Sequence, residues 1–213
     1  MSNNKLLNDY SQKEEFLNIL THGFGFVASS VGFIFLVIKS MRYVSFWESA
    51  SFIIFGLSMM LLYAASTLYH NAKNLEKRAK LKVFDHAAIF VLIAGSYTPF
   101  CIVALQSKLG WNMFLLVWVI ALVGIIFKLF FTGKLEHVST VMYVVMGWLV
   151  VFFISPLMDS LSELGATYLI TGGVFYTIGA ILYSIKKIPY NHAIFHVFVL
   201  LGSFSHFWAI YKL

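Results

Sequence analysis

Residues 188–211 read IPYNHAIFHVFVLLGSFSHFWAIY and contain no Asp, Glu, Lys or Arg over 24 positions. A helix needs roughly 20 apolar residues to cross a hydrocarbon core of about 30 Å, so this stretch is long enough to cross a membrane once and too short to cross it twice. His192 and His196 lie near its start, four residues apart, so on a helix their imidazoles share one face. The stretch predicts a transmembrane helix with two candidate metal ligands near one end.

Six further windows without a charged side chain have a similar length. They cover residues 16–38, 49–72, 86–107, 109–127, 137–158 and 164–185. The chain is 60% hydrophobic and only 11% charged, with a mean hydropathy of +0.84, which excludes an ordinary soluble domain. The windows are continuous apolar runs without the polar alternation of a membrane barrel. We therefore expect an all-α membrane protein, with a single seven-transmembrane helix bundle over residues 1–213.

The net charge of +6 is explained by membrane topology, so we expect no nucleic-acid partner. With seven spans, the N-terminus and the connections after spans two, four and six share one side. That side carries 11 of the 15 Lys and Arg residues, and the other side carries 4. The positive-inside rule therefore predicts a cytoplasmic N-terminus and an external C-terminus.

The segment before the first predicted span, residues 1–21, is amphipathic enough to form a short helix at the membrane interface. Glu14, Glu15, Asn18 and Thr21 are expected to cap neighbouring helix ends or hydrogen-bond to them from there. The segment has no apolar core followed by a small-residue cleavage site, so we expect no removable signal peptide.

The candidate site combines residues from three predicted spans on the cytoplasmic side. His70 ends span two, Asp85 begins span three, and His192 and His196 begin span seven. Three imidazoles with a carboxylate nearby suit zinc, and a fourth position left to water is typical of catalytic zinc sites. Asp85 is either the fourth ligand or a residue behind the ligands that holds the water. Ser66, one helical turn before His70, would support either arrangement.

The other histidines are interpreted as packing or interfacial residues, the usual role of a single histidine in a membrane protein. They are His22, His86, His137 and His206. The single cysteine, Cys101, excludes an internal disulfide and a thiolate cluster, and we expect it to serve packing.

Three blocks of the sequence resemble a known family. The blocks are EEFLNILTHG at 14–23, the Ser and His that begin and end 66–70 with Asp85 after them, and HAIFHVFVLLGSFSHF at 192–207. They resemble the three motifs of the progestin and adipoQ receptor (PAQR) family, and in detail its bacterial branch, called hemolysin III. The resemblance covers essentially the whole chain, with the motifs in the same order.

This resemblance implies a seven-helix bundle in the bacterial inner membrane with an intramembrane zinc ion. The ion would be held at His70, His192 and His196, while Asp85 would contact it through water and Ser66 would lie beside Asp85. The related receptors, and the alkaline ceramidases that they resemble, imply amide hydrolysis of a lipid. The bacterial branch implies a role in membrane homeostasis.

The leading hypothesis is a zinc-dependent hydrolase that acts on lipid amide or ester bonds within the cytoplasmic leaflet. Asp85 is expected to orient the attacking water and accept its proton, and Ser66 to steady Asp85 or the developing oxyanion. Membrane lipids are then both environment and substrate. The alternatives are a non-enzymatic sensor or regulator with structural zinc, and a channel or pore-forming haemolysin. A pore is disfavoured because no ladder of ionisable residues follows a path across the bilayer.

Overall fold

The computed structural model describes residues 10–132 and 135–213, and these residues form helices and short connections. The helices are α1 (Gln12–Ser40), α2 (Phe46–Asn71), α3 (Leu75–Pro99), η2 (Phe100–Ala104), α4 (Lys108–Phe131), α5 (Glu136–Gly147), η3 (Trp148–Phe153), α6 (Ile154–Ser160), α7 (Glu163–Ser184) and α8 (Asn191–Tyr211). Seven segments of this part of the chain are long and apolar enough to cross a membrane, with α3 and η2 forming one and α5, η3 and α6 another. The predicted all-α, seven-span fold is confirmed.

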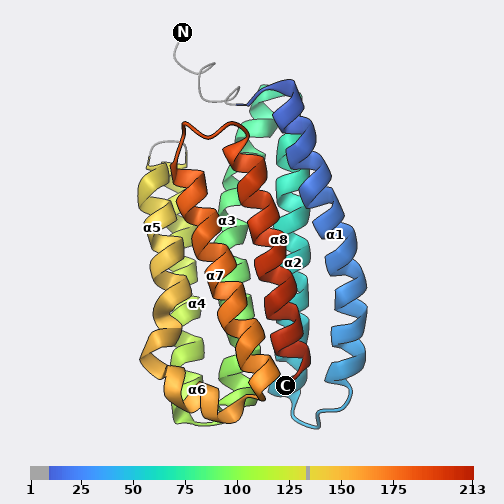
Figure 1. Ribbon diagram of the computed structural model, residues 1–213, viewed down its shortest axis with the longest axis vertical. Helices are drawn as coiled ribbons and strands as arrows, with labels where there is room; N and C mark the ends of the chain where they lie inside the picture. Colours follow the sequence, from blue (N-terminus) through green and yellow to red (C-terminus); the bar gives the residue numbers. More distant parts are fainter. Residues whose placement is uncertain (1–9, 133–134) are drawn as a thin grey trace.

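The seven segments run along the long axis of the molecule, with α1, α2 and α8 together on one side (Figure 1). α1 packs against both α2 and α8, α3 packs against α2 and α4, and α7 packs against α8. The span formed by α3 and η2 is central, because 72% of its apolar window is buried, against 22% for α1 and α4. We call the end of the bundle where α1 and α8 begin and α2 ends the histidine end.

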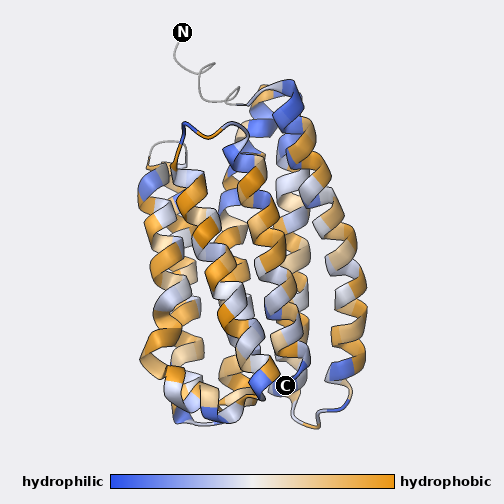
Figure 2. Cartoon of the chain, in the orientation of Figure 1, coloured by the Kyte–Doolittle hydropathy of each residue, from blue (hydrophilic) through white to orange (hydrophobic). Residues whose placement is uncertain are grey.

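The flanks of the bundle are apolar, and hydrophilic residues gather at its two ends (Figure 2). Large hydrophobic side chains such as Phe24, Val119 and Ile170 are more than half exposed on the outer surfaces of their helices. Exposed apolar surface of this extent is unstable in water and stable against lipid tails. The chain is therefore an integral membrane protein.

Pro99 marks a change of helix type within the third span. The α-helical part ends at Pro99, and a π-helical turn, Phe100–Ala104, continues the same span. Proline lacks the N–H that the regular helical ladder requires, so the hydrogen bonding shifts register there. Span five passes through the 3-10 segment η3 and ends at Ser160.

Helix α1 differs from the expected separate interfacial helix. It runs without a break from Gln12 to Ser40, so residues 12–21 form the first turns of the same helix as the span. Residues 1–9 of the expected interfacial segment lie outside the described residues. Ser11 caps α1 by accepting a hydrogen bond from the backbone N–H of Glu14.

A glycine brings α1 close to both of its neighbours. A Cβ at Gly25 would lie 2.6 Å from Cδ1 of Tyr63 on α2 and 2.8 Å from Cδ2 of Leu200 on α8. Only glycine fits this contact without a shift of its neighbours. As a result, the first turns of α1 lie against the histidine end of α2 and α8.

Candidate metal centre

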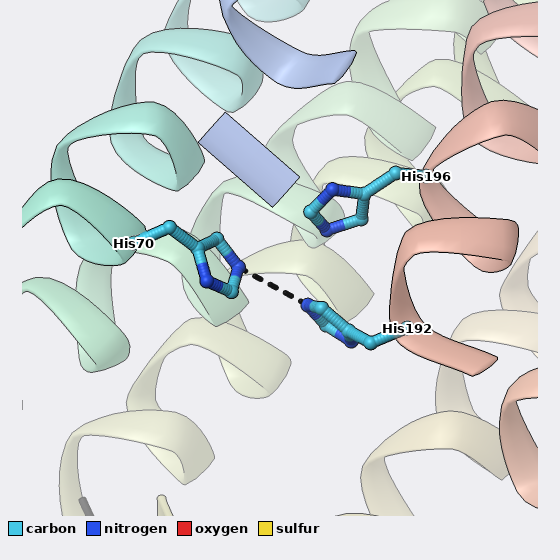
Figure 3. A group of neighbouring side chains, drawn as sticks. All are labelled: His70, His192 and His196. Atoms are coloured by element: carbon cyan, nitrogen blue, oxygen red, sulfur yellow. Dashed lines mark hydrogen bonds between the residues drawn. The ribbon is translucent and has the colours of Figure 1, made fainter. Parts of the chain in front are cut away.

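The three predicted histidine ligands converge at the histidine end. His70 lies in the last turn of α2, and His192 and His196 lie in the first two turns of α8. All three are buried, and one nitrogen from each lies within 4.8 Å of the other two. Figure 3 shows the rings from the two helices pointing toward one another, with 3.2 Å between Nε2 of His70 and Nε2 of His192.

This geometry fits zinc. A tetrahedral zinc ion with Zn–N bonds of about 2.0–2.1 Å holds its ligand nitrogens roughly 3.3 Å apart. The separation of 3.2 Å between the two Nε2 atoms of His70 and His192 is close to that value. Three imidazole ligands also favour zinc over magnesium or calcium, because those two ions prefer oxygen ligands.

Most of the buried polar side-chain atoms without a hydrogen-bond partner in the described part of the chain lie at the histidine end, Nδ1 of His206 being the exception. Among the described residues they include Oδ1 of Asn18, both ring nitrogens of His22, Oγ of Ser66 and Nδ1 of His192. A buried polar atom without a partner costs about 1–3 kcal/mol, so several in one region indicate a site that binds a polar ligand. They agree with an ion and its associated water among these side chains.

The first turns of α1 surround the histidines. Glu15 places Oε2 2.7 Å from Nδ1 of His70, and its Oε1 accepts a hydrogen bond from Arg78. The hydroxyl of Thr21 lies 3.2 Å from Nδ1 of His196. In both His70 and His196 it is therefore Nδ1 that faces α1, which leaves Nε2 on the other side of the ring. Glu15, Asn18 and Thr21, expected to cap neighbouring helix ends or hydrogen-bond to them, contact those ends through the imidazoles of His70 and His196.

Glu14, which was also expected to act on a neighbouring helix end, lies near the backbone N–H of His192 in the first turn of α8. Tyr190, the residue that precedes α8, provides no side-chain cap. A negative charge near a helix N-terminus is favourable, so a carboxylate from α1 lies where it can stabilise the start of α8.

Comparison with known proteins identifies the family. A family model described as haemolysin-III related matches residues 10–207, which include all of the site residues above. The chain belongs to the hemolysin III family. It is 45% identical over 201 residues to a hemolysin-3 homolog of Bacillus subtilis (strain 168), and the match covers 94% of each chain.

Two other relatives extend the hemolysin III comparison. Hemolysin-3 of Bacillus cereus is 40% identical over 198 residues, covering 93% of this chain and 90% of the relative. Monocyte to macrophage differentiation factor of Homo sapiens is 28% identical over 209 residues, covering 93% and 84%. These matches confirm the resemblance to the bacterial branch of the PAQR family that the three sequence blocks indicated.

In this hemolysin III protein, Ser66 and Asp85 hold different positions relative to the histidines. Ser66 is fully buried on α2, one turn from His70, and its hydroxyl has no partner in the described part of the chain. Asp85 is buried on α3, with Oδ2 3.5 Å from Nδ1 of His86. Its carboxylate does not belong to the group whose ligand atoms lie within 4.8 Å, which among the described residues contains histidines only. The role of Asp85 in holding a water stays a prediction.

His22, interpreted from the sequence as a packing residue, packs directly on one of the three predicted ligands, a neighbour that the sequence interpretation did not identify. It is buried, and its ring stacks on His196 with centroids 3.5 Å apart and planes 12° apart. The lone pair of an imidazole nitrogen lies in the plane of its ring, so two nearly parallel planes do not meet at one ion, and His22 in this position does not share an ion with His196. Glu15, Asn18 and His22 are spaced i, i+3 and i+7, which places them on one face of α1. This spacing is the sequence signal from which their position beside the three histidines could have been predicted.

The other residues interpreted as packing residues make their described contacts outside the group of His70, His192 and His196. Nδ1 of His86 lies 2.8 Å from the backbone carbonyl of Lys82, and His137 is exposed. His206 contacts the carbonyl of Leu169 through Nε2 at 3.3 Å, in a different layer of α8. Cys101 is buried and free.

Tyr10 covers the site just before α1 begins. Its ring stacks on His192 with centroids 4.7 Å apart, and it lies 5.8 Å from the ring of His70. The histidines are therefore enclosed by α1 and by the residue that leads into it.

Proposed function

We propose that this hemolysin III protein is a zinc-dependent hydrolase of lipid amide or ester bonds in the bacterial inner membrane, with a role in membrane homeostasis. The observation that carries the proposal is the buried group of His70, His192 and His196 at one end of an apolar bundle. The positive-inside rule assigns that end to the cytoplasmic leaflet.

The division of roles follows from the chemistry of the side chains. His70, His192 and His196 would hold the ion, which supplies Lewis-acid chemistry by polarising a carbonyl and lowering the pKa of water to about 7. Asp85 would accept the proton of the attacking water and return it to the leaving amine or alcohol. Ser66 would donate a hydrogen bond to the developing oxyanion or to Asp85.

A surface hollow at the histidine end supports a lipid substrate. Its volume is about 410 Å³, and it lies between the first turns of α1 and the residue before α8. It is lined by Gln12, Lys13, Phe16, Leu17 and Tyr190. Apolar walls with one cation suit an acyl chain and a polar headgroup, so a lipid could bind there directly from the bilayer.

The test is turnover by purified, zinc-loaded protein against a panel of ceramides, other N-acyl lipids and phospholipids. Release of free fatty acid is measured by mass spectrometry for the parent and for Asp85→Asn. We expect at least one lipid to be cleaved by the parent and cleavage to fall at least 100-fold in the variant. A panel left intact by the parent, or equal cleavage by both proteins, contradicts the hydrolase.

A second candidate is a non-enzymatic membrane sensor or regulator with structural zinc. It is favoured by the position of the group, because an ion bound by His70 of α2 and His192 of α8 would cross-link two helices. This candidate predicts that His192→Ala lowers thermal stability and function in cells together, with no lipid turnover to lose.

A further inference from the structure

A chain of contacts links His70, in the three-histidine group, to Glu15 on α1 and then to Arg78 on α3. Nδ1 of His70 lies 2.7 Å from Oε2 of Glu15. The other oxygen of Glu15 accepts a hydrogen bond from the buried guanidinium of Arg78. Arg78 also donates to the backbone carbonyls of Tyr69 and His70, each at 3.3 Å. One cation therefore holds both the carboxylate and the helix end that carries the histidine.

These contacts decide where the proton of His70 lies. A carboxylate only accepts hydrogen bonds, so Nδ1 of His70 must be the donor to Glu15. A neutral imidazole has one ring proton, and with that proton on Nδ1 the lone pair is on Nε2. Nε2 is the atom that faces His192 at 3.2 Å, on the side of the metal centre.

A competing contact is weaker. Nδ2 of Asn18 lies 3.4 Å from the same Nδ1, and as a donor it would require an unprotonated nitrogen. The contact with the carboxylate is shorter and charge-assisted, so it determines the tautomer. Oδ1 of Asn18 is also the amide atom without a partner, and a turn of the amide by 180° places that oxygen beside the ring N–H.

Thr21 fixes the proton of His196 in the same way, through a contact with Nδ1. Its hydroxyl has a single proton and lies 2.8 Å from the carbonyl of Leu17, the preferred acceptor one turn earlier. The hydroxyl oxygen therefore accepts from Nδ1 of His196 at 3.2 Å. Two ligands, from α2 and from α8, are thus held in the same tautomer by one face of α1.

We propose that Glu15, held by Arg78, is the positioning residue of the metal centre, and that Thr21 has the same role for His196. Glu15 keeps the proton of His70 on Nδ1, fixes the orientation of the ring, and so presents Nε2 to the ion. The inference rests on the proposed zinc centre and extends it to α1, which supplies none of the three ligands. Loss of a carboxylate in such a position typically weakens metal binding by about 10- to 100-fold.

The experiment measures zinc affinity by competition with a chromophoric chelator for purified parent, Glu15→Ala, Glu15→Gln and Glu76→Gln proteins. We expect a loss of roughly 10- to 100-fold for Glu15→Ala and a smaller loss for Glu15→Gln, which keeps an acceptor oxygen without the charge. Glu76 is the matched control, because it is exposed at the same end of the bundle and pairs only with Lys80 among the contacts described, at 2.7 Å. Its variant should bind zinc like the parent.

Nitrogen-15 NMR of the histidine side chains in metal-free protein separates positioning from folding. The parent and Glu76→Gln should show His70 protonated on Nδ1, and Glu15→Ala should show a mixture of tautomers. If Glu15→Ala does not fold, the proposal is tested with Glu15→Gln, which preserves the side-chain volume, by measuring its zinc affinity and the tautomer of its His70. Parent-like zinc affinity or a parent-like tautomer in both Glu15 variants overturns the proposal.

A second pair of variants tests Thr21. Thr21→Val keeps the volume, removes the acceptor and should weaken zinc binding about 10-fold, while Thr21→Ser should restore it. Thr67→Val is the control, because the hydroxyl of Thr67 donates to the carbonyl of Tyr63 and contacts no histidine among the described hydrogen bonds. Equal affinity for Thr21→Val and Thr67→Val overturns the role of Thr21. If the parent itself binds no zinc, the proposed function fails, while the tautomer measurement still tests Glu15.

Discussion

His22 lies face to face with His196, with ring centroids 3.5 Å apart and planes inclined by 12°. The edge of the Tyr63 ring packs against the same His22, at 5.1 Å between centroids. His196 is therefore held against α1 by the hydroxyl of Thr21 and the stacked ring of His22, which restricts the rotation of a predicted ligand that would otherwise have two free side-chain torsions.

The stacking predicts different results for two substitutions of His22. His22→Phe keeps an aromatic ring against His196, so zinc content should stay near that of the parent. His22→Ala leaves a cavity and should lower the free energy of unfolding by roughly 3 kcal/mol, as for other large buried aromatic side chains. Zinc content is measured by elemental analysis, and stability by thermal unfolding in detergent. Loss of zinc from a folded His22→Phe protein would show that His22 is itself a ligand.

Removal of the metal should destabilise the parent protein and leave the stability of the His192→Ala variant unchanged. A ligand at 100 times its dissociation constant stabilises the folded state by about 2.7 kcal/mol, so a strong chelator should lower the melting temperature of the parent. His192→Ala should melt at a lower temperature with no further response to the chelator. His206→Gln, in another layer of α8, should respond like the parent. A parent protein insensitive to chelation, with no zinc bound, contradicts the metal centre.

The close approach of α1 predicts a position-specific effect of added methyl groups. Gly25→Ala places a Cβ 2.6 Å from the Tyr63 ring and 2.8 Å from Leu200, so we expect a loss of about 1–3 kcal/mol in stability and weaker zinc binding as α1 moves away. Gly23→Ala is the control, because its nearest neighbour, Cγ2 of Thr67, lies 3.9 Å away. Equal melting temperatures for the two variants would contradict this account.

The predicted topology is tested by labelling single cysteines in a Cys101→Ser background. Lys73 and Asp159 are exposed at opposite ends of the bundle. With a cytoplasmic N-terminus, a membrane-impermeant maleimide should label Asp159→Cys in intact cells and Lys73→Cys only after permeabilisation. The reverse pattern would place the histidines in the outer leaflet.

The number of spans and the three predicted ligands followed from local features of the sequence. Window length sets how often a helix crosses the membrane, and the interval between His192 and His196 places them on one helical face. His22 was assigned to packing because a single histidine carries no signal about its neighbours on other helices. Asp85 was placed near the histidines by its depth along the helix, which does not determine the direction of a side chain around that helix, so its role in holding a water stays a prediction.

The sequence by itself determined that this protein is a bundle of seven membrane-spanning helices with three histidines at one depth, because hydrophobic length and helical period act within a single segment. Only the tertiary structure decided that α1 completes the site. Glu15 and His70 are 55 residues apart, and their contact at 2.7 Å depends on the close packing of α1 against α2 and α8 that Gly25 permits. The hydrogen bonds that orient the imidazoles join different helices, so they depend on packing, which no local pattern specifies.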